Sequence, residues 1–276
     1  MTEVNYLESL NPLQYESVCS TEGPNLIIAG AGTGKTKVLT TRVAHIIDNN
    51  LAFPSQILCV TFTNKAAREM SDRVQKLVSQ NMEKMPWMGT FHSIGAKIIR
   101  NHAEVIGLKQ SFTILDKDDQ LSLIKQIIKA ENLDQSQFSP KLIQSKIDHW
   151  KNKALNPNDI KSESLDNLVD EKSLSIYKIY QARLFEINCL DFGDLLLQCI
   201  NLFKVPDIHK RYSNNFKYIH VDEYQDTNAA QYKWLKLLSS HHQNVCCVGD
   251  DDQSIYSWRG AEAVSYTHLR AHETSK

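Results

Sequence analysis

GPNLIIAGAGTGKT, at residues 23–36, joins a short apolar run to a glycine-rich turn and then to the start of a helical pattern. The run 26–28 is long enough for a buried strand, and apolar residues at helical spacing continue to Ile47. The backbone N–H groups of such a turn and the positive end of the helix dipole both favour an anion. In this motif Lys35 reaches the β- and γ-phosphates of a nucleotide, and the Thr36 hydroxyl binds Mg²⁺. The stretch therefore predicts a nucleotide-binding α/β domain with a parallel sheet.

The predicted phosphate site consists of Ala29, Gly30, Ala31, Gly32, Thr33, Gly34, Lys35 and Thr36. Ala29 stands where the motif usually begins with glycine, but the glycines next to the phosphates are kept. The alternative is a glycine-rich turn with an incidental lysine. The spacing and the flanking elements both favour the phosphate site.

The composition is that of an ordinary globular protein, with 42% hydrophobic and 23% charged residues among 276. The formal net charge is −1, so any nucleic-acid surface must be local. The six cysteines form no CxxC pair, which favours reduced core thiols and argues against zinc. Because we find no signal-peptide pattern and no apolar run near bilayer length, we expect a cytoplasmic protein without membrane contact.

One polar residue before the phosphate loop is a candidate base reader. Residues 5–18 have a helical pattern, with Pro12 at a helix start directly after Asn11. Gln14 lies on this helix. A solvated helix face is the ordinary interpretation of a single glutamine. The alternative is adenine recognition, because a carboxamide can pair with both N6 and N7 of the base.

Two further stretches place side chains at predicted strand ends. Residues 57–62 are apolar and β-rich, which is typical of a strand buried on both faces, and Thr63 or Asn64 can cap the helix that follows. Phe62 lies at the carboxyl edge of the sheet, where ligands bind, so core packing and ligand stacking are both open for its ring. In the next such stretch, His92 is a candidate base. A lone histidine beside a helix start is more often a backbone or phosphate contact, which is the interpretation we take.

Residues 116–186 hold almost no β-branched runs. Helix starts are signalled there by Asp116, Ser139-Pro140 and Asn156-Pro157. We interpret this region as an all-helical insertion into the α/β domain. The α/β domain would then consist of residues 1–115 and 187–263, followed by a separate tail at 264–276. Residues 190–196 are expected to return the chain to the α/β domain with an amphipathic helix.

Adjacent carboxylates follow the strand predicted at residues 218–221. Asp222 suits Mg²⁺ held jointly with Thr36, and Glu223 suits activation of an attacking water. Two neighbouring acids after a strand are often just a turn. Their occurrence together with a phosphate loop favours the catalytic interpretation.

The last apolar strand pattern, at residues 245–248, leads into a polar segment. Gln253 in this segment can hydrogen-bond a γ-phosphate or the attacking water. Trp258 and Arg259 offer a stacking plane and a cation, which suit single-stranded bases and their backbone. A buried tryptophan is the alternative, and the polar surroundings disfavour it.

Six stretches in one order resemble superfamily 1A DNA helicases of the UvrD/Rep/PcrA type, from residue 5 to about 263. They are LNPLQ (10–14), AGAGTGKT (29–36), TFTNKAA (61–67), GTFHS (89–93), VDEYQDTN (221–228) and GDDDQSIYSWRGA (249–261). The resemblance implies a RecA-like P-loop NTPase domain with a parallel sheet and an inserted all-helical subdomain. It implies a hydrolase that uses ATP and Mg²⁺, moves 3′ to 5′ on single-stranded DNA and unwinds duplexes at junctions, in DNA repair or replication.

The resemblance also implies roles for individual residues. Gln14 would read adenine, next to Lys37, where relatives often carry an arginine that packs on the base. Lys35, Asp222 and Glu223 would act on MgATP, and Gln253 would couple the γ-phosphate to DNA. The residues on the DNA path would be Phe62, Asn64, Thr90, His92, Tyr256, Trp258 and Arg259.

The end of the chain departs from the family. Relatives continue with a second RecA-like domain that supplies arginines to the γ-phosphate, whereas residues 264–276 do not resemble that continuation. We therefore expect a truncated amino-terminal half, poorly active alone, with a foreign and poorly ordered tail. Two other functions fit the motifs. One is an ATP-gated single-stranded DNA-binding module without unwinding activity, and the other is the motor part of a recombination helicase-nuclease subunit.

Overall fold

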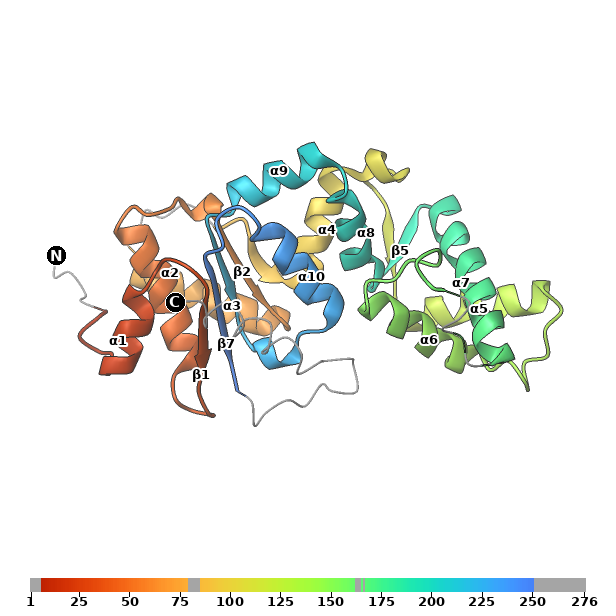
Figure 1. Cartoon of the computed structure of the whole chain (residues 1–276), viewed down its shortest axis with the longest axis horizontal. Helices are drawn as coiled ribbons and strands as arrows, with labels where there is room; N and C mark the ends of the chain where they lie inside the picture. Colours follow the sequence, from red (N-terminus) through yellow and green to blue (C-terminus); the bar gives the residue numbers. More distant parts are fainter. Residues whose placement is uncertain (1–5, 79–84, 162–164, 166, 251–276) are drawn as a thin grey trace. The chain divides into compact units, whose positions relative to one another are not determined.

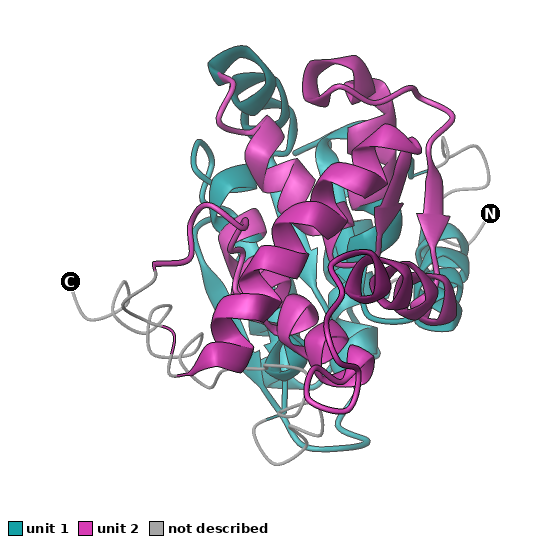
Figure 2. Ribbon diagram, turned by 90° about the vertical axis from the view of Figure 1, so that its right-hand side faces the viewer, with its two compact units in different colours: residues 1–94, 206–227, 235–276 teal, residues 95–205, 228–234 magenta. Residues whose placement is uncertain are grey.

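The structure, a computed structural model, describes residues 6–78, 85–161, 165 and 167–250 (Figure 1). By contacts within the chain it divides into two compact units (Figure 2). Unit 1 contains residues 1–94, 206–227 and 235–276, and unit 2 contains residues 95–205 and 228–234. The domain boundaries predicted after residues 115 and 186 both fall inside unit 2, and they stay a prediction. The predicted tail, 264–276, lies outside the described residues.

Unit 1 is built on a five-stranded sheet in the order β1-β7-β6-β2-β3, with every neighbouring pair parallel. Its strands are β1 (Asn25–Ile28), β2 (Ile57–Thr61), β3 (Met88–Thr90), β6 (Tyr218–Val221) and β7 (Val245–Gly249). The described strands include the parallel α/β sheet that the sequence predicts. Because the strands are parallel, their carboxyl ends share one edge, and the loops after them meet there.

The helices of unit 1 are α1 (Pro12–Cys19), α2 (Lys35–Asp48), α3 (Asn64–Leu77) and α9 (Pro206–Asn215). Leu39 and Val43 of α2, with Met70 and Val74 of α3, pack on buried residues of β2, β6 and β7 in one core. Every residue of β2 is buried, as its apolar sequence predicts. The buried strand predicted at residues 26–28 is wrong in its burial, because β1 lies at the edge of the sheet, where Leu26 and Ile27 are half-buried and Ile28 is exposed. Two helices, α4 (Phe91–Asn101) and α10 (Ala229–Leu238), begin in one unit and end in the other.

Helix α1 is shorter than the helix predicted over residues 5–18. It begins at Pro12 because Asn11 has an extended backbone, as the residue before a proline prefers, and its side chain accepts the N–H of Gln14. At the start of α3 the cap is Thr63, whose hydroxyl accepts the N–H of Ala66 at 3.1 Å. Asn64 is therefore the first helical residue, and its exposed side chain is not the cap.

Unit 2 contains α5 (Lys117–Ala130), α6 (Pro140–Asn152), α7 (Leu168–Glu186) and α8 (Asp194–Leu202). Isoleucines of α5 and α6 and tyrosines of α7 share its core. Helices begin at two of the predicted starts, Asp116 and Ser139-Pro140, and α7 follows them. The start predicted at Asn156-Pro157 is wrong, because this segment is a turn in which the Asn156 N–H donates to the Asp159 carboxylate and the Asp159 N–H donates to the Asn156 carbonyl. Two strands that the sequence did not reveal, β4 (Thr113–Leu115) and β5 (Cys189–Asp191), form a parallel pair. Each has three residues, too few for an alternating pattern to be recognised. Residues 190–196, predicted to return to the α/β domain, contribute to β5 and α8 in unit 2.

A buried ionic cluster organises the centre of unit 2. The Lys151 ammonium is 2.7 Å from a carboxylate oxygen of Asp191 and 2.9 Å from one of Asp194. Tyr180 also donates its hydroxyl proton to Asp191 at 2.8 Å. A Cβ on Gly193 would lie only 2.8 Å from the Lys151 side chain. This glycine therefore allows the buried lysine to pass the turn between β5 and α8.

The described residues also form three short 3₁₀ turns, η1 (Pro54–Gln56), η2 (Ala103–Ile106) and η4 (Tyr224–Asp226). All six cysteines are free thiols. No helix among the described residues is long and apolar enough to span a bilayer.

Candidate nucleotide-binding site

The phosphate loop connects the end of β1 to the first residue of α2, which is Lys35. Gly32 and Gly34 have φ angles of +73° and +88°, which L side chains rarely adopt, so the turn needs glycine at both positions. Helix α2 has no side-chain cap at its N-terminus. Its first backbone N–H groups are therefore available to an anion at the positive end of the helix dipole.

The Lys35 ammonium is held by two oxygens. It donates to the backbone carbonyl of Ala29 at 2.9 Å and to Oδ2 of Asp250 at 3.0 Å. Asp250 directly follows β7, the strand next to β1. Only 10% of the lysine side chain and 4% of the aspartate side chain are exposed, so this ion pair is poorly screened by solvent.

The paired acids follow β6, and their environments differ. Asp222 is buried, and desolvation with the nearby charge of Glu223 raises the pKa of its carboxyl to about 6, against a smaller lowering by Lys35. Its Oδ1 atom has no hydrogen-bond partner among the described residues. Glu223 has φ +52° and ψ +48°, a left-handed conformation that is rare for a non-glycine residue. Backbone strain of this kind is concentrated at functional sites.

Two site residues were missed by the sequence analysis. The Gln225 carboxamide donates to Oε2 of Glu223 at 2.7 Å and accepts the backbone N–H of Asp250 at 3.0 Å. Asp250 in turn pairs with Lys35. The available signal was their position, since each is a polar residue shortly after a strand of the same parallel sheet.

Gln14 reaches the phosphate loop. Its Nε2 donates to the carbonyl of Thr33 at 2.9 Å, and its Oε1 accepts the N–H of Asn11 at 3.1 Å. A carboxamide has two donors and two acceptor sites, so one of each is left for an adenine edge. The ammonium of Lys37 donates to the carbonyl of Ser9 at 2.6 Å, close in sequence to the start of α1.

The predicted DNA residues that the structure describes follow two adjacent strands. Phe62 comes directly after β2 and Thr90 is the last residue of β3, and Thr61 of β2 pairs with Thr90. The Phe62 ring is half-buried and lies against Phe91, with ring centroids 5.5 Å apart. His92 is also half-buried. Thus Phe62, Thr90 and His92 lie along the edge that carries the acids. Gln253, Tyr256, Trp258 and Arg259 lie outside the described residues.

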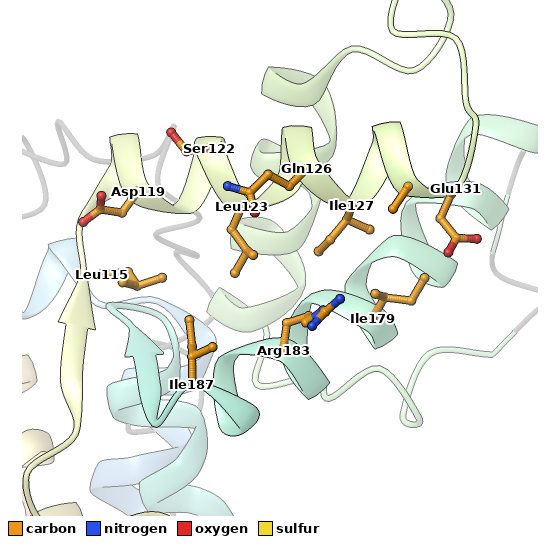
Figure 3. A pocket seen from close by; sticks show the side chains of 11 residues that line it. Leu115, Asp119, Ser122, Leu123, Gln126, Ile127, Glu131, Ile179, Arg183 and Ile187 are labelled. Atoms are coloured by element: carbon orange, nitrogen blue, oxygen red, sulfur yellow. The ribbon is translucent and has the colours of Figure 1, made fainter.

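A separate groove of about 520 Å³ lies in unit 2 between α5 and α7 (Figure 3). Its floor is apolar, with Leu123 and Ile127 on one side and Ile179 on the other, and Asp119 and Arg183 are among its polar residues. None of the predicted site residues lines this groove.

Comparison with known proteins agrees with the geometry of the nucleotide site. The family model described as UvrD/REP helicase N-terminal domain matches residues 10–273. DNA helicase II of Rickettsia typhi is 50% identical over 266 residues, which cover 95% of this chain and 40% of that protein. ATP-dependent DNA helicase PcrA of Staphylococcus aureus is 49% identical over 257 residues, which cover 93% of this chain and 35% of that protein. The chain thus spans 35–40% of the length of these relatives. With a phosphate loop and paired acids on one sheet edge and a match over nearly its whole length, the chain belongs to the UvrD/REP helicase N-terminal domain family.

Proposed function

We propose that this chain binds MgATP at the carboxyl edge of its sheet and uses hydrolysis to drive 3′-to-5′ movement on single-stranded DNA, as part of a DNA helicase. The observation that carries the proposal is the ion pair between Lys35 and Asp250. Asp250 directly follows β7, the next strand in the chain after the paired acids Asp222 and Glu223. Lys35 pairs with Asp250, and Asp250 is bonded to Gln225, which is bonded to Glu223. The names of the two relatives, a DNA helicase and an ATP-dependent DNA helicase, support the same function.

Nucleotide phosphates would replace Asp250 as the partner of Lys35. The ammonium now balances one buried carboxylate, and the phosphates offer a larger negative charge at the uncapped start of α2. The remaining donor and acceptor of Gln14 would receive the adenine edge. Binding would therefore exchange one counter-ion of the Lys35 ammonium for another, so the ammonium stays paired.

The residues also fit Mg²⁺. Oδ1 of Asp222 is a buried anionic oxygen without a hydrogen-bond partner, which is the kind of ligand that Mg²⁺ prefers. Thr36 supplies the second ligand of the motif. Among the described residues no group of three or more His, Cys, Asp or Glu forms a metal site. This agrees with Mg²⁺, which usually takes one or two protein ligands and completes its shell with waters and substrate phosphates. When bound, the ion would neutralise charge that develops on the phosphates.

Glu223 would accept a proton from the attacking water or orient it. Its left-handed backbone is strained, and η4 directly follows it. Gln253, outside the described residues, would sense the γ-phosphate. An arginine supplied by the second RecA-like domain of longer relatives would raise the rate further, by about 10³–10⁵ in related reactions.

Single-stranded DNA, and duplex junctions in the whole protein, would be the nucleic-acid partners. The strand-end residues Phe62 and Thr90 would meet the bases or backbone, with Asn64 and His92 close to them in sequence. Tyr256, Trp258 and Arg259 would extend this path. A cytoplasmic location is part of the proposal, in keeping with six reduced thiols.

Titration with a fluorescent ATP analogue tests the nucleotide site. Lys35→Ala should abolish Mg²⁺-dependent binding, whereas Lys65→Ala, which removes an 88% exposed lysine side chain of α3, should leave it intact. Equal affinity in the Lys35→Ala variant and the unchanged chain would contradict the assignment.

A further inference from the structure

We propose that Gln225 is a positioning residue, which holds the Glu223 carboxylate in one orientation for hydrolysis. The inference rests on the proposed function. Gln225 is buried, with 6% of its surface exposed. Its Nε2 donates to Oε2 of Glu223 at 2.7 Å, and its Oε1 accepts the Asp250 N–H at 3.0 Å. Both ends of the carboxamide are therefore hydrogen-bonded, the N–H₂ group to an acceptor and the carbonyl oxygen to a donor.

The two partners define the orientation of the amide. A rotated carboxamide would place its N–H₂ against the Asp250 N–H and its carbonyl against the Glu223 carboxylate, and both contacts would be repulsive. The backbone position of Asp250 is fixed by β7, which pairs with β6 over three residues. Gln225 thus fixes the position of the Glu223 side chain relative to the backbone at the end of β7.

The bond also assigns the two oxygens of Glu223. Oε2 accepts from Gln225, which leaves Oε1 for the attacking water. The amide of Gln225 therefore restricts rotation of the Glu223 carboxylate. Without the amide donor, the carboxylate could rotate, and a misplaced base slows a reaction without weakening substrate binding.

Gln225 also joins the base to the phosphate-binding lysine. The Asp250 backbone is bonded to Gln225, and the Asp250 carboxylate is bonded to Lys35. The arrival of phosphates at Lys35 would release the Asp250 side chain but leave its backbone N–H on Gln225. The base therefore keeps its orientation while the lysine changes partners.

The test is single-turnover hydrolysis of radiolabelled MgATP, with the chain in excess over nucleotide and oligo-dT present. It distinguishes a positioning role of Gln225 from a role in packing alone. Gln225→Glu keeps the acceptor for the Asp250 N–H, loses the donor and places two carboxylates together. We expect hydrolysis to slow about 10- to 100-fold, as for a lost hydrogen bond to a charged group. We expect the affinity for the fluorescent ATP analogue to stay within about twofold, because only an interaction needed for the reaction is removed.

Three variants complete the comparison. Glu223→Gln should abolish hydrolysis and shows that the measured rate belongs to this site. Gln225→Met removes both hydrogen bonds and should lower the melting temperature as well as the rate. Gln231→Met is the matched control, since Gln231 is 4% exposed and accepts a backbone N–H, from Asn228 at 2.8 Å, outside this site. The Gln231→Met substitution should lower the melting temperature and leave the rate at which bound nucleotide is hydrolysed unchanged.

Nuclear magnetic resonance with labelled glutamine gives a reading that needs no hydrolysis. Glu223→Ala should shift the side-chain amide resonances of Gln225 and accelerate their exchange with solvent, because their carboxylate acceptor is gone. Unchanged resonances and exchange in that variant would overturn the inference.

The kinetic outcomes distinguish the two proposals. If Glu223→Gln abolishes hydrolysis and Gln225→Glu hydrolyses at the unaltered rate, positioning by Gln225 is wrong and the nucleotide site stands. A rate loss in Gln225→Glu that is matched by lost ATP affinity would likewise mean a structural role only. If the unaltered chain binds no MgATP, the proposed function itself fails.

Discussion

The ammonium of Lys35 and the carboxylate of Asp250, separated by 215 positions in the chain, lie 3.0 Å apart at the carboxyl ends of β1 and β7. The two strands are hydrogen-bonded neighbours, and this places the phosphate loop beside the residue that follows β7. The ion pair gives the lysine a buried counter-charge where a nucleotide's phosphates would otherwise supply one. We therefore expect the stability of the chain to depend on whether nucleotide occupies the proposed site.

Asp250→Asn tests that linkage. Loss of the carboxylate leaves Lys35 without its buried counter-ion, so we expect the free energy of unfolding without nucleotide to fall by about 1.5–3 kcal/mol. Saturating MgATP should remove most of the difference, because phosphates replace the missing charge. Thermal denaturation with and without MgATP measures both effects. An equal loss of stability in the two conditions would argue against exchange of partners at Lys35.

Asp222→Asn should increase the stability of the chain but remove its Mg²⁺ binding. The pKa of Asp222 is about 6 in the folded chain, against an ordinary value of 3.8, so folding favours its protonated form. Above pH 6 the ionised carboxylate destabilises the fold, and below about pH 4 it is protonated in both states. Asparagine should therefore stabilise the chain by roughly 1–3 kcal/mol at pH 7.5 in EDTA, and the gain should vanish near pH 4.

The same substitution should remove the Mg²⁺ dependence of nucleotide binding. Denaturant unfolding at several pH values and nucleotide titrations with and without Mg²⁺ measure the two consequences. A variant less stable than the unaltered chain at pH 7.5 would show that the Asp222 carboxylate is favourable to folding, contrary to its raised pKa.

Buried His220 should make the chain sensitive to acid. Both ring nitrogens lack hydrogen-bond partners among the described residues, and burial with the nearby Arg42 charge lowers its pKa well below 6.5. Below pH 6.5 the unfolded state takes up a proton that the folded state excludes, so stability falls as the pH falls. The loss can reach about 1.4 kcal/mol per pH unit. His220→Leu should flatten this slope, whereas replacement of the exposed His241 by Gln should not. A slope that persists in His220→Leu would assign it to other groups.

Phe62→Ala should weaken binding of labelled oligo-dT by about 1–3 kcal/mol if a base stacks on the ring. Phe53→Ala is the control, since Phe53 is 73% exposed and comes before β2 rather than after it. Titrations need one fixed salt concentration, because phosphate contacts depend strongly on salt. Equal affinity of the Phe62→Ala and Phe53→Ala variants would make Phe62 a packing partner of Phe91 only.

Local elements of the site could be predicted from the sequence because short-range physics fixes them. Glycines at 32 and 34 permit the left-handed turn, and an apolar run before them with helical spacing after them places a strand and a helix on either side. Asp222 and Glu223 follow a short apolar strand in the same way. The family resemblance of these motifs was confirmed by the match over residues 10–273.

Only the tertiary structure decided which side chains meet. Strand order β1-β7-β6 is a property of the assembled sheet, and it alone brings Asp250 to Lys35 and to Gln225. The same holds for β4 and β5, which are three residues each and become strands by pairing with one another. The buried ammonium of Lys151 is likewise paired with the carboxylates of two aspartates about forty positions away in the sequence. Periodicity and turn chemistry are encoded within a few residues, whereas a buried charge is satisfied only by groups that folding brings from elsewhere in the chain.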